Sequence, residues 1–391
     1  MRHVVVVGAS LAGLRTSEAL RRHGHRGRIT IVGAEPQLPY DRPPLSKALL
    51  TGRTTADRLQ LPRATELEAD FVLGVRAVSL DRDGREIGLA NGRKIPYDGL
   101  VIATGARAAV NGARAGTEPR PWTLRSLADA VALRDRLVPR QRIRVVGGGF
   151  LGNEIAAAAR QRGCEVELVT RGKLPLLAAA GEPVATLVAE LHRRAGVTLH
   201  MKNPQSPADV TIAAIGAKPN VEWLSGAGLQ LDNGLLCDRC LRPITQDGEP
   251  VSNIVAAGDV VRWPHSLAGG SPITVGHWSN AVDQAEIAAR NLLFPDRPLP
   301  FTAVPSYWSD LYDARLRAIG LPHLGSPVVE EHDPTAMRLV VTYWQDSELV
   351  GAITINRTSR LAPYRTALAK HHQVGGSETD LSCGGTGLSV R

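Results

Sequence analysis

Cysteine and aromatic residues are scarce in this chain of 391 residues. It contains four cysteines, and Phe, Trp and Tyr together make up 4% of it. So few cysteines in a long chain argue against a fold held together by disulfide bonds. Hydrophobic residues of all kinds still make up 43%, which is enough for large cores, and the length is compatible with two or three domains.

Long apolar runs are also missing. A membrane-spanning helix needs about 20 consecutive apolar residues, and the run at residues 4–7 is far shorter than that. It follows directly on Met1-Arg2-His3, which leaves no room for the charged and apolar regions of a secretory signal. We therefore expect a cytoplasmic protein without a membrane segment.

Acidic residues are outnumbered by basic ones, and the net charge is +8. A basic chain is compatible with nucleic acid, an anionic membrane or an acidic protein as its partner. The basic residues are scattered, without a basic tail or an interleaved aromatic platform, so we expect no nucleic-acid partner. Two interpretations of the charge stay open: a solvated basic surface, or a surface that attracts an acidic partner protein.

Two segments of the chain have the same plan. Residues 4–13 and 143–152 each contain a short apolar run that ends in glycines, and an Ala-rich amphipathic helix is predicted after each. A second apolar run follows each helix, at residues 28–32 and 165–169. This succession of strand, helix and strand is typical of a parallel sheet. We therefore predict an α/β chain with two Rossmann-like dinucleotide-binding domains.

The rest of the chain completes these domains and adds a third. Further predicted strands close the two units and lie at residues 99–105, 210–216 and 254–259. Beyond about residue 298 we predict two antiparallel strands at residues 338–344 and 349–355, followed by a helix at residues 360–371. The first predicted domain is discontinuous and covers residues 1–108 and 238–297, and the second covers residues 109–237. A small α+β domain covers residues 298–372, and a disordered tail rich in Gly, Ser and Thr covers residues 373–391.

The first glycine motif is Gly8-x-Ser10-x-x-Gly13. Gly8 permits a tight turn, Gly13 permits close packing of the helix, and the helix directs its N-terminal amides at a pyrophosphate. Ser10 departs from the usual glycine but still allows close approach of the backbone. Glu35 lies beyond the second strand, where a carboxylate binds a ribose diol, although a solvated loop charge is the alternative.

The second glycine motif, Gly147-x-Gly149-x-x-Gly152, matches the full dinucleotide pattern. One chain with two such folds implies two dinucleotides, and the obvious pair is FAD with NADH or NADPH. The acidic residue is missing after the following strand, where Thr170 and Arg171 stand instead. These residues suit the 2′-phosphate of NADPH, and a merely charged loop is the alternative.

Several further segments carry a resemblance to a known family. The two prolines at Pro43 and Pro44 fix an extended entry that brings Arg42 and Lys47 to the ligand side of the first fold. Together with six other motifs, this segment resembles the FAD-dependent ferredoxin reductases of bacterial oxygenase systems, the putidaredoxin and rubredoxin reductase type, over nearly the whole chain to about residue 372. The motifs are residues 8–13, 42–47, 103–105, 147–154, 257–260, 277–281 and 307–310.

The resemblance implies a glutathione reductase-like arrangement and assigns residues to both cofactors. The residues implied for FAD are Gly8, Ser10, Ala12, Gly13, Glu35, Arg42, Lys47, Ala77, Ala103, Thr104, Gly105, Arg125, Asp259, Trp278 and Trp308. The residues implied for NAD(P)H are Gly147, Gly149, Phe150, Leu151, Gly152, Glu154, Thr170 and Arg171. No metal site is expected.

The resemblance also implies that Lys47 and Glu154 are the catalytic pair. In similar enzymes they form an ion pair at the reactive nitrogen of the flavin, where an ammonium group stabilises the charge that hydride transfer creates. The alternatives are a solvated lysine and a helix glutamate stabilised by the helix dipole.

Disulfide reductases with this double fold carry a cysteine pair beside the flavin, and here residues 42–47 contain no cysteine. The spacing Cys237-x-x-Cys240 falls in a predicted strand and turn, and we expect both to be structural. Electrons then leave the flavin singly, and an acidic iron–sulfur ferredoxin that serves an oxygenase is the expected partner. The alternatives are an NAD(P)H oxidase or direct reductase of small molecules, and a redox-sensing interaction protein similar to apoptosis-inducing factor. The protein is expected to be a monomer or homodimer.

Two departures from the family pattern bear on the nucleotide. The segment at residues 196–215 lacks a hairpin that relatives have, and Gly276 stands where relatives often have an acidic residue near the nicotinamide. Both leave the choice between NADH and NADPH open.

Overall fold

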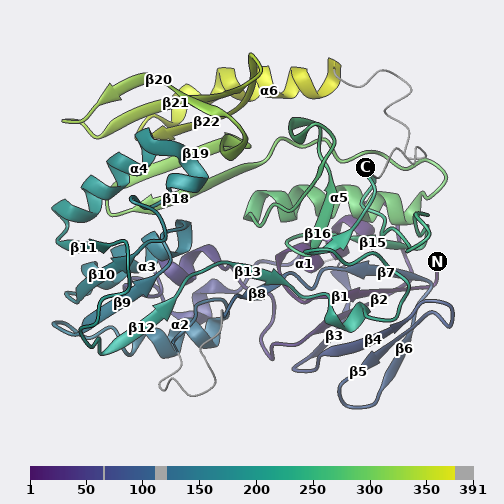
Figure 1. Ribbon diagram of the computed structural model, residues 1–391. Helices are drawn as coiled ribbons and strands as arrows, with labels where there is room; N and C mark the ends of the chain where they lie inside the picture. Colours follow the sequence, from purple (N-terminus) through teal and green to yellow (C-terminus); the bar gives the residue numbers. More distant parts are fainter. Residues whose placement is uncertain (65–66, 111–120, 375–391) are drawn as a thin grey trace.

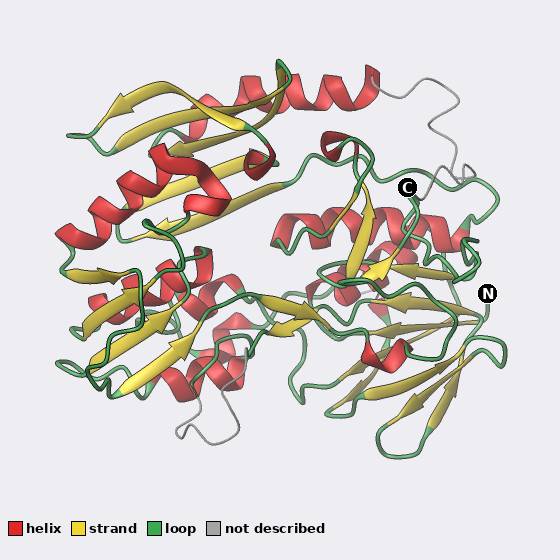
Figure 2. Ribbon diagram, in the orientation of Figure 1, coloured by secondary structure: helices red, strands yellow, loops and turns green. Residues whose placement is uncertain are grey.

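The computed structural model describes residues 1–64, 67–110 and 121–374. Three large sheets, each with its own helices, organise this part of the chain (Figures 1 and 2). No helix in the described ranges is both long enough and apolar enough to cross a membrane.

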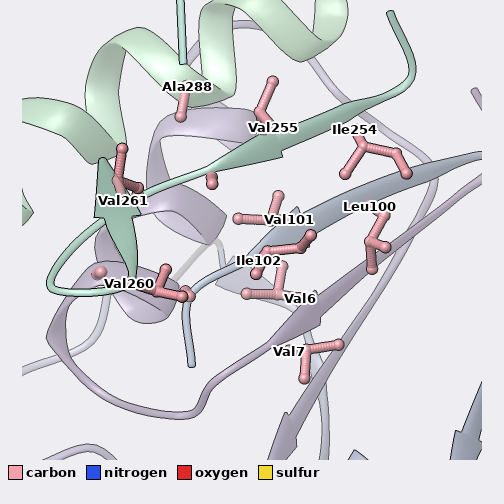
Figure 3. Packing of buried hydrophobic residues seen from close by; sticks show 14 of the residues in the cluster. Val6, Val7, Leu100, Val101, Ile102, Ile254, Val255, Val260, Val261 and Ala288 are labelled. Carbon is pink, nitrogen blue, oxygen red and sulfur yellow. The ribbon is translucent and has the colours of Figure 1, made fainter. Parts of the chain in front are cut away.

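The first sheet is parallel, with the strand order β15-β7-β1-β2-β3. Its strands are β1 (His3–Val7), β2 (Arg28–Gly33), β3 (Asp70–Leu73), β7 (Gly99–Ile102) and β15 (Ile254–Ala256). Helices α1 (Leu11–Arg22) and α5 (Trp278–Leu293) pack together beside it. Figure 3 shows the buried aliphatic side chains of β1, β7 and β15 beneath Ala288 of α5.

Smaller elements extend this first region. An antiparallel meander is formed by β4 (Ala77–Asp81), β5 (Glu86–Leu89) and β6 (Lys94–Pro96). A second group consists of β14 (Leu235–Leu236), β16 (Val261–Pro264) and β17 (Pro272–Ile273). Trp223 and Leu229 already belong to the core of the first region, so the chain returns to it before residue 238, where the sequence placed the boundary.

The second sheet repeats the parallel plan with the strand order β11-β10-β9-β12. Its strands are β9 (Arg142–Val146), β10 (Glu165–Val169), β11 (Val197–His200) and β12 (Val210–Ala213), and its helices are α2 (Leu127–Arg134), α3 (Phe150–Gln161) and α4 (Leu177–Arg194). The antiparallel pair β8 (Ala106–Ala108) and β13 (Ala217–Pro219) carries the chain between the two regions. The predicted pair of Rossmann-like units is therefore confirmed.

The third sheet is antiparallel, with the order β18-β19-β22-β21-β20. Its strands are β18 (Ser306–Leu311), β19 (Ala314–Gly320), β20 (Ser326–Asp333), β21 (Arg338–Gln345) and β22 (Glu348–Ile355), and helix α6 (Ala362–Val374) follows them. The predicted strand pair and helix are present as β21, β22 and α6. Residues 373 and 374 of the predicted tail end α6, and the tail from residue 375 lies outside the described ranges.

Candidate active site

The first glycine loop connects β1 to α1 and depends on two glycines. Gly8 has a φ of +127°, and a Cβ atom there would lie 2.0 Å from the carbonyl oxygen of Ala103. A Cβ on Gly13 would lie 1.9 Å from the carbonyl oxygen of Gly8. Ser10 is the N-cap residue of α1, and its hydroxyl makes no capping hydrogen bond. The first amides of α1 therefore remain available to an anion.

The second glycine loop reproduces this geometry between β9 and α3. Gly147 has a φ of +124°, and a Cβ atom there would lie 2.1 Å from the carbonyl oxygen of Ala214. A Cβ on Gly152 would lie 1.8 Å from the carbonyl oxygen of Gly147. A Cβ on Gly149, the N-cap residue of α3, would meet nothing within 4 Å, which leaves the backbone open to a ligand. The chain thus contains two glycine loops of equivalent geometry.

Glu35 lies in a network of hydrogen bonds and an ion pair. Tyr40 donates its hydroxyl to Glu35 Oε2 at 2.5 Å, and Arg42 Nη2 lies 2.6 Å from Glu35 Oε1. Arg42 also donates to the carbonyl oxygen of Arg125 at 2.6 Å and to the hydroxyl of Ser10 at 3.2 Å. Glu35 is therefore held in place although its side chain is 34% exposed, and each of its oxygens retains a lone pair for a ribose hydroxyl.

Arg125 and Asp259 form a second ion pair at the cleft. The distance from Arg125 Nη2 to Asp259 Oδ2 is 2.6 Å, and Arg125 Nε donates to the carbonyl oxygen of Ala106 at 2.8 Å. Asp259 follows β15, at the carboxyl end of the parallel sheet, where ligands of such folds bind. Two partners therefore orient the Arg125 guanidinium, and its positive charge balances the negative charge of the Asp259 carboxylate.

Lys47 and Glu154 are brought together from two different regions. Lys47 follows a short 3₁₀ turn (Pro43–Ser46), Glu154 lies in α3, and the Nζ to Oε1 distance is 2.7 Å. Two hydroxyls also bind the carboxylate: Ser46 donates to Oε2 at 2.5 Å, and Ser309 of β18 donates to Oε1 at 2.7 Å. Glu154 is 7% exposed, so three donors hold this carboxylate in a nearly dry position.

Ser46 and Ser309 were not recognised as partners of Glu154 in the sequence. Ser46 lies next to Lys47, and Ser309 lies in the motif at residues 307–310, so both were within segments that the resemblance singled out. Their contact with Glu154 depends on tertiary approaches over 108 and 155 residues of sequence, respectively.

Aromatic side chains form one wall of the cleft. The indole of Trp278 donates to Asp41 Oδ1 at 2.8 Å and meets Trp308 edge to face at a ring distance of 6.0 Å. His277 stacks on Tyr307 with ring centroids 4.4 Å apart. Burial lowers the pKa of His277 to about 4, so the imidazole is neutral at neutral pH. An uncharged, largely apolar wall of this kind suits a flat conjugated ring.

Residues from all three regions line a cleft of about 300 Å³. The predicted residues that line it are Ser10, Ala12, Arg42, Lys47, Ala103, Gly105, Arg125, Phe150, Leu151, Glu154, Asp259, Trp278 and Trp308. Sequence reasoning did not assign Ser46, Leu124, Gly258, His277 and Tyr307, which also line it. The first glycine loop and the arginines suit the pyrophosphate of FAD, and the aromatic wall suits its isoalloxazine ring.

Ten predicted residues do not line the cleft: Gly8, Gly13, Glu35, Ala77, Thr104, Gly147, Gly149, Gly152, Thr170 and Arg171. Thr104 donates its hydroxyl to the carbonyl oxygen of Asn220 at 2.8 Å and does not line the cleft. Ala77 is the first residue of β4 and follows the segment in which the backbone amide of Val75 donates to the carbonyl oxygen of Gly33. Thr170 is 4% exposed and donates its hydroxyl to Gly172 at 2.5 Å, so that hydroxyl is committed within its own loop. A backbone contact of Ala77 with FAD remains a prediction.

The cysteines of the described ranges lie away from the cleft. Cys237 is a buried free thiol, and burial raises the pKa of this thiol well above its usual value. Cys240 is buried as well, and neither residue lines the cleft. A thiol pair is therefore absent from the cleft among the residues that the structure describes. No group of three or more His, Cys, Asp and Glu side chains among them could hold a metal.

Comparison with known sequences gives two family matches. The pyridine nucleotide-disulphide oxidoreductases match residues 2–285, and the family described as reductase C-terminal matches residues 306–379. The chain is 34% identical over 388 residues to the anthranilate 1,2-dioxygenase system ferredoxin–NAD(+) reductase component of Burkholderia cepacia, with 93% of both chains covered. It is 33% identical over 384 residues to putidaredoxin reductase of Pseudomonas putida, with 91% of this chain and 89% of that one covered.

Solved structures show the same arrangement. The crystal structure of Fdr9 has a TM-score of 0.85 and 32% identity, with 95% of both chains covered. Putidaredoxin reductase in its covalent complex with putidaredoxin has a TM-score of 0.85 and 29% identity, with 97% of this chain and 96% of that one covered.

Proposed function

The chain belongs to the pyridine nucleotide-disulphide oxidoreductase family, and from this premise we propose that it is an FAD-dependent NAD(P)H:ferredoxin oxidoreductase that serves an oxygenase, such as a haem-thiolate monooxygenase. The observation that carries the proposal is the composition of the cleft. The first glycine loop, the N-terminal turn of α3 and the tryptophans of two regions meet around the Lys47–Glu154 pair. Relatives named as ferredoxin–NAD(+) reductases support the choice of acceptor.

The side chains of the cleft have separate tasks in this proposal. Bound FAD supplies an acceptor for the hydride of the nicotinamide and a donor of single electrons. The Lys47 ammonium stabilises negative charge at the ring, and Glu154 fixes the position of that ammonium through the 2.7 Å contact. Ser46 and Ser309 keep the carboxylate oriented, and the buried position excludes water, which strengthens each of these interactions.

Electron exit is assigned to the edge of the cleft at Trp308. This side chain is 36% exposed and also lines the cleft, so it connects the ring site with the surface. The net charge of +8 favours the approach of an acidic ferredoxin. Small-molecule reduction without a protein acceptor is the competing function.

The test compares electron delivery with and without a ferredoxin. We expect haem-protein reduction by NAD(P)H only when an acidic [2Fe–2S] ferredoxin is added, and Trp308→Leu should slow it by on the order of tenfold. Flavin reduction by the nucleotide should be affected less. Trp344→Leu is the matched control because Trp344 is 39% exposed but lies outside the cleft. Rapid NAD(P)H oxidation that ferredoxin does not stimulate would favour the oxidase instead.

Nucleotide choice is tested at the end of β10. Arg171 is exposed there, and an acidic residue that would bind a ribose diol is missing. We propose that Arg171 binds the 2′-phosphate of NADPH, so Arg171→Glu should shift the ratio of flavin-reduction rates toward NADH by about tenfold. Stopped-flow reduction by each nucleotide gives the ratio, with Arg193→Glu on the exposed face of α4 as the charge-matched control. An unchanged ratio removes Arg171 from the nucleotide site.

A further inference from the structure

A chain of buried polar groups connects the third region with the second glycine loop. Asn153 Nδ2 donates to the carbonyl oxygens of Gly148 and Gly149, at 3.0 and 2.7 Å. Asn153 Oδ1 lies 2.8 Å from His192 Nε2, and His192 Nδ1 lies 2.9 Å from the hydroxyl of Tyr312. Asn153 and His192 are both completely buried.

The chemistry of these groups fixes the direction of every hydrogen bond. The Asn153 oxygen can only accept, so His192 carries its proton on Nε2 and accepts at Nδ1 from Tyr312. Burial lowers the pKa of His192 to about 4, which keeps this neutral form. All polar atoms of both side chains are therefore satisfied, as burial requires.

The two carbonyls belong to the loop at the N-terminus of α3, and each also accepts from a backbone amide, Gly148 from Leu176 at 2.8 Å and Gly149 from Asn153 at 3.1 Å. The Asn153 side chain adds a second donor to each carbonyl. Because the peptide group is planar and trans, a carbonyl turned toward Asn153 directs the amide of the same peptide group the opposite way. The amides of Gly149 and Phe150 are therefore turned away from Asn153, toward the open side of the loop, where a Cβ on Gly149 would meet nothing. These are the amides that an anion at this helix end would bind.

The first glycine loop lacks such a clamp. Its geometry is the same, and the position equivalent to Asn153, one residue after the last glycine, is occupied by the buried Leu14. A buried asparagine is thus not needed to form the turn, and its presence in one loop only indicates a task specific to the second dinucleotide.

Tyr312 reaches His192 from the turn between β18 and β19. It has a φ of +56°, in the left-handed region that non-glycine residues rarely adopt. Its ring also meets the imidazole edge to face at 5.6 Å. The preceding strand β18 carries Ser309, which binds Glu154, so β18 and the turn after it contact both the ion pair and the buried histidine that binds Asn153.

We propose that His192 is a positioning residue for the pyridine nucleotide: through Asn153 it holds the amides of the second glycine loop toward the nucleotide pyrophosphate, and Tyr312 of the third region holds His192. The inference rests on the proposed function, since it assigns the second loop to NAD(P)H. His192 itself does not touch the nucleotide. Its loss should therefore lower nucleotide affinity and leave the chemistry of hydride transfer nearly unaffected.

The test measures affinity and rate separately on the FAD-loaded protein. Calorimetric titration with NAD⁺ and NADP⁺ gives dissociation constants without turnover, and stopped-flow reduction gives the limiting rate at saturating NADH or NADPH. We expect His192→Leu to raise the dissociation constant of the preferred nucleotide by about tenfold, and the limiting rate to change by less than about twofold. His192→Gln should restore most of the affinity because its amide can donate to Asn153 Oδ1.

Controls separate positioning from general loss of stability. His25→Leu removes another buried histidine, which lies in the first region, and should leave nucleotide affinity unchanged. If His192→Leu does not fold, Tyr312→Phe removes one hydroxyl only and should still raise the dissociation constant about threefold. Folded His192 and Tyr312 variants with wild-type affinity overturn the inference. A wild-type protein that binds neither nucleotide instead overturns the proposed function.

Discussion

Gly8→Ala protein is expected to purify without FAD. The new Cβ would lie 2.0 Å from the carbonyl oxygen of Ala103, at the end of a central strand, and the residue would have to keep a φ of +127°. Neither the strand nor the loop can move without breaking the pairing of β1 with β7. We expect the FAD dissociation constant to rise by on the order of a hundredfold, which corresponds to about 2.7 kcal/mol. Flavin absorbance per protein after gentle purification, followed by reconstitution titrations, measures the effect.

Ser10→Ala is the matched control in the same loop. A side chain is already accommodated at this position, and the substitution removes only a hydroxyl that accepts from Arg42 at 3.2 Å. Ser10 lines the cleft, but the backbone path of the loop is unchanged in this variant, so its FAD content should fall much less than that of Gly8→Ala. Full flavin content in Gly8→Ala would show that the loop is not the pyrophosphate cradle. Wild-type protein that is colourless and cannot be reconstituted with FAD would contradict the entire assignment.

The parts of the fold that follow local rules were predictable from the sequence. The apolar runs at residues 4–7 and 143–146 and the glycines after them predict β1 and β9 with their loops, because strand, turn and helix signals all lie within about 20 residues. In the third region only β21 and β22 were found. β20 carries mostly exposed residues, and β18 shows no regular alternation over its whole length. β19 does alternate between buried apolar and more exposed charged residues from Ala314 to Ala318, and this pattern could have identified it.

The contacts that complete the site were not predictable in the same way. Ser309 and Glu154 lie 155 residues apart, and nothing in their local sequence indicates that they meet. Thr170 was assigned to the phosphate from its place after β10, whereas the fold turns its hydroxyl into the loop toward Gly172. Side-chain direction in a loop depends on tertiary packing, which a single sequence does not reveal.

Lys47→Met should slow reduction of the flavin by NAD(P)H by on the order of tenfold or more, which corresponds to at least about 1.4 kcal/mol in the barrier. Lys47 Nζ lies 2.7 Å from Glu154, in a cleft where the carboxylate is 7% exposed. Methionine keeps the apolar stem and removes the positive charge. Negative charge at the ring then lacks its stabilising partner, and Glu154 keeps two hydroxyl donors but no cation. Stopped-flow absorbance at saturating nucleotide measures the rate.

Two variants decide whether the charge of Lys47 acts at the ring or only in packing. Lys94→Met removes a lysine that is 68% exposed and paired with Glu86 on the β-meander, and it should leave the rate unchanged. Glu154→Gln keeps an acceptor for Ser309 while removing the counter-charge, so the ammonium stays but loses its fixed position. A slow Lys47→Met with an intermediate Glu154→Gln assigns the larger effect to the ammonium. A Lys47→Met rate equal to that of the wild type would show that this lysine takes no part in hydride transfer.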